Sequence, residues 1–353
     1  MAGTVVLKIF LLLMGFVLLV KGADFFVDGA SGIAKKLKVS TFIIGVTVVA
    51  LGTSAPEAAV TIMDAATSTG ELITGNILGS NIMNIFLILG ISALVCNLPV
   101  EKTTRIIDLP FLILISGLFV ILGFIGGTFE WWEGLILLLL YFGFMAYNIV
   151  LATRQSKASL EQATAVSVGA DEAVAEEIHG WYNKLKNSYE NLKSKVWFLI
   201  IITVIGLGMV VGGAQLVVDS AKFIAQDWIG ISPEIVALTV VAFGTSLPEL
   251  VTSVSAAKKG DVGIATGNII GSNIANILLI GGLGAVCKGT HGLSFTTEGL
   301  ISGIVSLFAA ILIFACSFGK TKSLGKIAGI IMLVCLVAYY GFVFANFYAF
   351  KLY

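Results

Sequence analysis

Two stretches of this sequence are nearly the same: TVVALGTSAPE at residues 47–57 and TVVAFGTSLPE at residues 239–249. A second matching pair follows them, TGNILGSNIMNI at 74–85 and TGNIIGSNIANI at 266–277. Residues 40–85 align with 232–277 without a gap, and 22 of the 46 aligned positions are identical. An internal duplication of this kind has to be explained before any single residue is given a role.

The composition around these motifs is that of an integral membrane protein. Of the 353 residues, 58% are apolar and only 12% are charged, with a mean hydropathy of +1.02. A soluble domain carries about 25% charged residues. This difference excludes a soluble enzyme, a nucleic-acid-binding protein and a disordered protein. No protein partner is implied, so the expected surroundings are the lipid bilayer.

Ten apolar stretches are long enough to cross a bilayer as helices, and they lack the short alternating segments of a membrane barrel. They lie at about 4–21, 41–63, 71–95, 107–127, 131–152, 196–218, 232–256, 262–286, 297–318 and 325–347. The sequence therefore predicts an all-α membrane protein with ten transmembrane helices.

The duplication divides this chain into two inverted halves. We expect a first five-helix half at 1–152, a connecting segment at 153–195 and a second five-helix half at 196–353. Because five is odd, the second copy enters the membrane from the opposite side, which is the arrangement of many secondary transporters. Pro56 and Pro248 should interrupt the helices of the two motifs, since proline removes a helix hydrogen bond.

The basic residues predict the orientation. With the N-terminus outside, 17 of the 21 Lys and Arg residues fall on the five inner connections. The positive-inside rule then places both termini outside the cell membrane and the 153–195 connection in the cytoplasm. A solvated linker is the favoured interpretation of that connection, with an amphipathic helix near 170–193 as the alternative. We expect no cleavable signal peptide.

Two carboxylates stand out because they lie inside apolar spans. Glu57 and Glu249 each follow the proline of their motif. A charge at the bilayer centre costs at least ~2.5–3.5 kcal/mol on insertion scales. The four spans at 41–63, 71–95, 232–256 and 262–286 contain no Lys or Arg that could neutralise these groups. A bound cation is the natural counter-charge.

Oxygen-bearing residues recur on the same helix faces as these carboxylates, at spacings of three and four. The first repeat supplies Ala50, Thr53, Ser54, Asn76, Ser80 and Asn84, and the second supplies Ala242, Thr245, Ser246, Asn268, Ser272 and Asn276. Ca²⁺ takes 6–8 hard oxygen ligands, and Na⁺ can use the same atoms. Soft metals are disfavoured, because the four cysteines lie in or beside apolar runs and both histidines lie in loops.

Some of these residues have structural alternatives. Taken alone, Ser80 or Thr53 would more often hydrogen-bond a neighbouring helix than bind an ion. Asn81 and Asn273 lie one position off the ligand face and are expected to hold the helix break together. For Asp28 and Asp219, at span ends, a capping role and a role in ion entry remain open.

These motifs resemble those of the cation/calcium exchanger superfamily, most closely its prokaryotic-type sodium/calcium exchangers. GTSAPE (52–57) with GNILGSNIMN (75–84), and GTSLPE (244–249) with GNIIGSNIAN (267–276), are similar to the two alpha repeats of that family. The resemblance implies a core of spans 2, 3, 7 and 8, with spans 1 and 6 sliding against it. It also implies exchange of several Na⁺ for one Ca²⁺ without a cofactor.

The resemblance also implies a ligand set. The ligands would be Thr53, Ser54, Glu57, Ser80, Asn84, Thr245, Ser246, Glu249, Ser272 and Asn276, with main-chain carbonyls from Ala50 and Ala242. Many relatives have Asp at one of the positions matching Asn84 and Asn276, whereas here both are Asn. In this superfamily an Asp matching Asn276 tends to accompany K⁺ dependence, so K⁺ co-transport is less expected here.

Other functions are weighed against this one. An H⁺/Ca²⁺ antiporter could use the same glutamates, although the many neutral oxygens favour Na⁺. A channel would more often assemble identical subunits around an axis along the membrane normal. An enzyme is disfavoured, since the intramembrane residues provide neither an HExxH motif nor an acid, histidine and nucleophile set. A purely structural protein would not need duplicated, unpaired glutamates.

Overall fold

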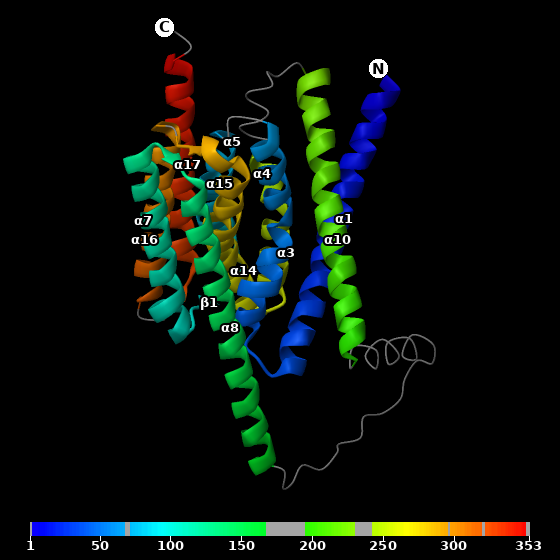
Figure 1. The fold of residues 1–353 in the computed structure, drawn as a ribbon. Helices are drawn as coiled ribbons and strands as arrows, with labels where there is room; N and C mark the ends of the chain where they lie inside the picture. The colour runs from blue at the N-terminus through cyan, green and yellow to red at the C-terminus, as the bar shows by residue number, and fades with distance from the viewer. Residues whose placement is uncertain are drawn as a thin grey trace.

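The computed structural model of the protein describes residues 2–67, 71–166, 195–229, 242–295, 297–319 and 322–350, which are almost entirely helical (Figure 1). In the labels used here, η marks a π-helical segment, except that η7 is a 3₁₀ turn. The first half contains α1 (Ala2–Leu37), α2 (Thr41–Ile44), η1 (Gly45–Val49), α3 (Ala50–Thr53), α4 (Ala55–Thr67), α5 (Glu71–Ile82), η2 (Met83–Leu89), α6 (Gly90–Val95), β1 (Leu98–Pro99), η3 (Thr104–Asp108), α7 (Leu109–Gly126), β2 (Thr128–Phe129) and α8 (Trp131–Val166).

The described part of the second half has a similar order of long helices. It contains α10 (Val196–Phe223), η4 (Ile224–Trp228), α12 (Ala242–Thr245), α13 (Leu247–Lys258), α14 (Val262–Ala275), η6 (Asn276–Ile280), α15 (Gly281–Lys288), η7 (Gly289–His291), β3 (Leu293–Ser294), α16 (Thr297–Ser317), β4 (Ser323–Leu324) and α17 (Lys326–Phe350).

The predicted membrane helices are confirmed. Eight helices of the described chain are long and apolar enough to cross a membrane, and a ninth span is a pair, Thr41–Thr53 and Ala55–Ile62, bent by 42°. The predicted span at 232–256 lies partly outside the described residues, because 232–241 are not among them. The count of ten therefore stays a prediction.

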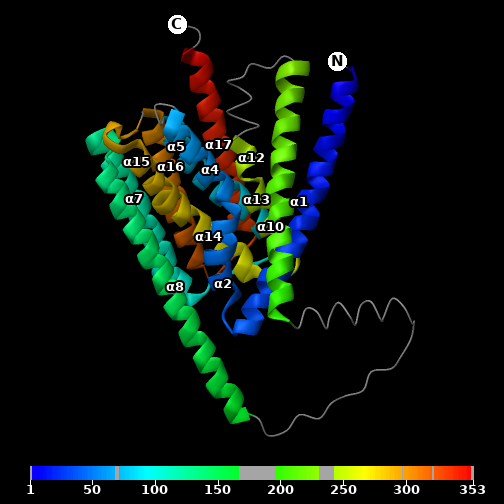
Figure 2. The same cartoon turned by 45° about the vertical axis from the view of Figure 1, so that its right-hand side comes forward.

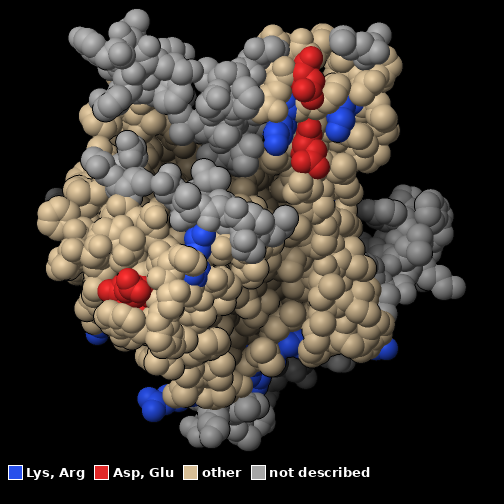
Figure 3. All heavy atoms as spheres, turned by 45° about the horizontal axis from the view of Figure 1, so that its top comes forward, with Lys and Arg blue, Asp and Glu red and all other residues tan. Residues whose placement is uncertain are grey.

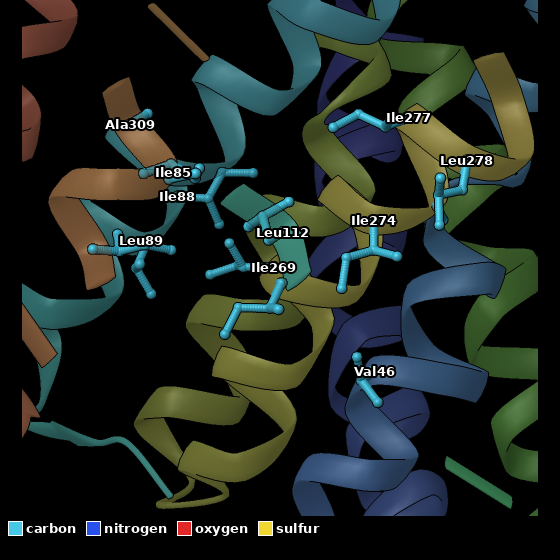
Figure 4. Close-up of a cluster of buried hydrophobic side chains, with 14 of the residues drawn as sticks. Val46, Ile85, Ile88, Leu89, Leu112, Ile269, Ile274, Ile277, Leu278 and Ala309 are labelled. Atoms are coloured by element: carbon cyan, nitrogen blue, oxygen red, sulfur yellow. The ribbon is translucent and has the colours of Figure 1, made fainter. Parts of the chain in front are cut away.

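Two of the spans form the centre of the molecule. In Ile73–Val95 and Val262–His291, 78% and 83% of the most apolar 18-residue window is buried, against 11–33% in the other six single-helix spans. Figure 4 shows part of the buried cluster to which both contribute, with Ile85, Ile88 and Leu89 on one side and Ile269 and Ile274 on the other. These are the helices that carry the second motif of each repeat. The outer helices leave large apolar side chains exposed, as contact with lipid requires.

Two short β clips join the halves in a reciprocal way. β1 follows the central helix of the first half and pairs with β4, which lies between the last two helices of the second half. β3 follows the central helix of the second half and pairs with β2, which lies between the last two helices of the first half. The two clips are therefore equivalent by the repeat: β1 corresponds to β3, and β4 corresponds to β2. These clips were not foreseen in the all-α prediction, since each strand has only two residues.

α1 and α10 pack against each other as a long antiparallel pair beside the rest of the bundle (Figures 1 and 2). Glycines seven residues apart allow the close approach. A Cβ built on Gly15 would lie 2.9 Å from the carbonyl oxygen of Gly213, and one on Gly22 would lie 2.9 Å from that of Gly206. Small residues at such a seam let two membrane helices meet backbone to backbone.

The connection between the halves differs from a simple loop. The sequence predicts a polar connection from residue 153, but α8 continues as a helix to Val166 and extends beyond the bundle (Figure 1). Ala, Gln, Glu and Lys are good helix formers, which accounts for the extension. The alternative helix at 170–193 lies outside the described residues.

The described chain begins and ends on the same side of the bundle, while α8 ends and α10 begins on the opposite side (Figure 1). This agrees with the predicted common side for both termini. Viewed toward the side where the chain begins and ends, the described surface shows few charged side chains (Figure 3). Which side faces the cytoplasm stays a prediction.

The glycine seam leads to a stability prediction. Gly22→Ala should destabilise the protein by about 1–3 kcal/mol, because its Cβ would lie 2.8 Å from the Val210 backbone nitrogen. Gly208→Ala in α10 is the matched control, since a Cβ there meets no described atom within 4 Å and alanine favours helix. Thermal unfolding in detergent should show a lower midpoint for Gly22→Ala but not for Gly208→Ala. Equal midpoints of the two variants would contradict the close packing of α1 against α10 at Gly22.

Candidate functional site

Both motif helices break at the same residue of the repeat. Ser54 has φ −84° and ψ 7°, and its equivalent Ser246 has φ −88° and ψ 2°. These values lie in the bridge region of backbone space, where turn residues lie, and each serine forms the turn that separates two helices. Pro56 and Pro248 follow in the first turn of α4 and α13, where a missing N–H costs least. The predicted interruptions are therefore confirmed, and proline marks the restart of each helix.

The break buries the two predicted carboxylates in the centre of the protein. Glu57 and Glu249 are 2% and 1% exposed, and each lies in the first turn of its restarted helix. The unpaired N–H groups and dipole at a helix N-terminus favour a carboxylate there. Ser54 Oγ donates a 3.0 Å hydrogen bond to Glu249 Oε1, which joins the first repeat to the second. Ser54 lies three residues before Glu57, so this bond brings the two carboxylate-bearing turns together.

Several predicted ligands are buried and have an oxygen atom without a hydrogen-bond partner in the described chain. The following oxygens accept no hydrogen bond from the described part of the chain: Glu57 Oε2, Glu249 Oε2, Ser246 Oγ, Ser272 Oγ, Asn84 Oδ1 and Asn276 Oδ1. A buried polar atom without a partner costs about 1–3 kcal/mol. Carboxylate, hydroxyl and amide oxygens are all ligands of hard cations, so this set of atoms is suited to bind one.

The amide ligands lie where the central helices change their winding. The π-helical segment η2 begins at Met83, just before Asn84, and η6 begins at Asn276 itself. π-Helical turns inside α-helices are often associated with functional sites. Ser80 and Ser272 lie one turn earlier, in α5 and α14, and are 3% and 0% exposed.

Other predicted ligands have protein partners. Thr53 Oγ1 donates to Asn268 Oδ1 at 3.0 Å and contacts the Ala50 carbonyl at 3.3 Å. That carbonyl also accepts from the Ser54 backbone N–H at 3.0 Å. Because the single hydroxyl hydrogen of Thr53 is directed at Asn268, the Ala50 carbonyl oxygen keeps acceptor capacity. In the second repeat, Ala242 begins α12 and Thr245 ends it.

The polar contacts extend beyond the ligand set that the resemblance implies, to Asn268, which the sequence already placed on the oxygen-bearing helix face. Asn268 accepts from Thr53, and its Nδ2 donates to Ser253 Oγ at 2.9 Å. The equivalent first-repeat atoms, Asn76 Nδ2 and Thr61 Oγ1, have no partner in the described chain. The signal was present in the sequence, because the same shift of 192 aligns Asn76 with Asn268 and Thr61 with Ser253.

Two aspartates with open roles lie in separate polar contacts. Asp28 forms a 2.8 Å ion pair with Lys259, which joins α1 to the end of α13. Asp219 accepts a 2.9 Å hydrogen bond from Gln215 within α10. Among the described residues, no group of three or more His, Cys, Asp or Glu side chains could hold a metal ion. The candidate site therefore depends on two acids and many neutral oxygens.

Duplicated broken helices that enclose buried carboxylates define the protein as a membrane transporter of the inverted-repeat class. Comparison with known proteins gives the family. The family model described as sodium/calcium exchanger protein matches residues 7–150 and 198–346. The chain belongs to this family, which confirms the resemblance seen in the motifs and makes the protein a transporter and not an enzyme.

Individual relatives support the same assignment over nearly the full length. The sodium/calcium exchanger MaX1 of Methanosarcina acetivorans is 33% identical over 93% of this chain and 96% of its own. An uncharacterized membrane protein of Methanocaldococcus jannaschii is 34% identical, over 92% of this chain and 94% of its own. A solved structure of the sodium-calcium exchanger NCX_Mj is 31% identical with a TM-score of 0.75, and the match covers 96% of this chain and 99% of that one.

Ser54 and Ser246, the serines at the two helix breaks, differ in their hydrogen bonds, and this difference leads to a prediction. Ser54→Ala should lower the stability of the ion-free protein by about 1–3 kcal/mol, because Glu249 Oε1 loses its buried donor. Ser246→Ala should change it little, since its hydroxyl has no partner in the described chain. Thermal unfolding in a chelator tests both. A larger effect of Ser246→Ala would contradict the observed pairing.

Proposed function

We propose that the protein exchanges Na⁺ for Ca²⁺ across the cell membrane at a site built around Glu57 and Glu249. One observation carries the proposal: two carboxylates from opposite repeats are buried, the Ser54–Glu249 bond joins the repeats there, and each carboxylate has an oxygen without a partner in the described chain. The spans at 41–63, 71–95, 232–256 and 262–286 contain no basic residue to neutralise them. Two negative charges match one Ca²⁺, and neutral serine and asparagine oxygens complete a set suited to hard cations.

The same oxygens can serve Na⁺ when Ca²⁺ is absent. The neutral donors Ser246, Ser272, Asn84 and Asn276 would let the site divide into several smaller Na⁺ sites around the two carboxylates. The relatives support this choice of ions, since MaX1 is named a sodium/calcium exchanger and NCX_Mj structures have been obtained with Na⁺ and Sr²⁺. Our ligand set is the twelve residues predicted from the sequence, with Asn268 as a neighbouring polar residue.

The charge of the empty site explains why exchange would be obligatory. A site without ions would carry two uncompensated carboxylates through the low-dielectric centre of the protein, which costs several kcal/mol. The loaded site is neutralised and can change its exposure from one side to the other. The inverted repeats provide the two alternative arrangements, with α1 and α10 as the pair that moves against the core.

The same proposal gives a direction. If three Na⁺ enter for each Ca²⁺ that leaves, one net positive charge moves inward in each cycle. At a membrane potential of 100 mV, negative inside, this is worth ~2.3 kcal/mol and favours Ca²⁺ export. Both termini would then lie outside, with the 153–195 connection in the cytoplasm, as the basic residues predict.

A flux measurement tests the proposal. Proteoliposomes loaded with Na⁺ and diluted into Na⁺-free buffer should take up ⁴⁵Ca²⁺, and Glu57→Gln or Glu249→Gln should reduce the initial rate by about a hundredfold, because each removes half of the site's charge. Glu133→Gln is the matched control. Glu133 is also buried, but it accepts a bond from the Glu130 N–H at the start of α8.

The controls separate the coupling ions. Uptake that requires internal Na⁺ supports the proposal, whereas uptake driven by a proton gradient alone would make the protein an H⁺/Ca²⁺ antiporter. Uptake under neither gradient would mean that Ca²⁺ is not the substrate. Equal losses in Glu133→Gln and Glu57→Gln would remove the case for the carboxylate site.

A further inference from the structure

Four buried asparagines link the two central helices beside the candidate site. Asn81 and Asn84 lie in α5 and η2, and their repeat equivalents Asn273 and Asn276 lie in α14 and η6. All four are 0–1% exposed. Asn276 Nδ2 donates to Asn81 Oδ1 at 3.0 Å, and Asn84 Nδ2 donates to Asn273 Oδ1 at 3.5 Å. The two bonds are equivalent by the repeat, since Asn81 corresponds to Asn273 and Asn84 to Asn276. We refer to these four residues as the amide clamp.

One main-chain carbonyl determines the direction of the amides on one side of the clamp. Asn81 Nδ2 donates to the backbone oxygen of Asn273 at 3.3 Å. Because a carbonyl can only accept, the NH₂ group of Asn81 must face it, and Asn81 Oδ1 is left to face Asn276. Asn276 must then present its own NH₂ group to Asn81. Its Oδ1 is thereby turned to the other side, where it has no partner in the described chain.

This orientation matters for a cation site. An asparagine can present either its carbonyl oxygen or its NH₂ group, and only the oxygen can bind a cation. The amide clamp leaves the oxygens of Asn84 and Asn276 without protein donors, while their NH₂ groups are used in bonds to the opposite repeat. We propose that Asn81 and Asn273 are positioning residues that hold the Asn276 and Asn84 oxygens toward the transported cation. This inference rests on the proposed function.

The two sides of the clamp are unequal. The Asn276–Asn81 bond is shorter than the Asn84–Asn273 bond, and only Asn81 is itself anchored to a backbone carbonyl. Asn273 Nδ2 has no partner in the described chain. Asn81 therefore has the larger effect.

A double-mutant cycle on Ca²⁺ binding tests the role of Asn81. ⁴⁵Ca²⁺ binding to the purified full-length protein is measured for wild type, Asn81→Ala, Asn276→Ala and the double variant. Each single change should weaken binding about tenfold. The double variant should bind within threefold of Asn276→Ala, because Asn81 acts through Asn276 and has nothing left to position. Asn81→Leu, which fills the volume without a polar group, should match Asn81→Ala.

The control is another buried asparagine. Asn148 is 1% exposed, and its Nδ2 donates to the Phe144 carbonyl in α8. Asn148→Ala should lower thermal stability as Asn81→Ala does, but leave Ca²⁺ binding unchanged. Multiplicative losses in the double variant, or wild-type binding by Asn81→Ala and Asn81→Leu, would overturn the positioning role and leave the proposed function standing. Failure of the wild-type protein to bind Ca²⁺ would overturn both.

Discussion

The structure depends on two carboxylates that are buried without a basic partner. Glu57 and Glu249 come from opposite repeats and lie among helices that supply hydroxyl and amide oxygens but no positive charge. Such a pair is costly in a membrane unless a bound cation or protonation neutralises it. The helix breaks at Ser54 and Ser246, the restarted helices that begin at the carboxylates, and the burial of the two central spans can all be understood as ways to hold this pair.

The duplication supplies two copies of one unit, but the side-chain bonds of the two copies differ. The break serines have nearly equal dihedral angles, and the β clips and asparagine bonds interchange between repeats. In contrast, Ser54 Oγ donates to Glu249 Oε1, whereas Ser246 Oγ has no partner in the described part of the chain.

Much of this architecture could be predicted from the sequence, because a membrane leaves few choices. Long apolar runs must form helices, Pro56 and Pro248 must interrupt them, and intramembrane glutamates must be neutralised. The repeat made the site residues visible in pairs. What could not be predicted depends on contacts between the repeats. Ser54 bonds Glu249 while Ser246 has no partner in the described part of the chain, and Thr53 is directed at Asn268 of the other repeat. The extension of α8 to Val166 depends on local helix propensity in a stretch that hydropathy marks as polar.

The central claim is that one divalent cation lies between the two carboxylates, and anomalous diffraction would test it directly. Crystals of the protein soaked in Sr²⁺, which stands in for Ca²⁺ and scatters anomalously, should show a strong peak in contact with Glu57 Oε2 and Glu249 Oε2. Asn276 Oδ1 and Ser272 Oγ should lie within the same coordination shell. A peak elsewhere in the protein, with both carboxylates turned away from it, would contradict the account.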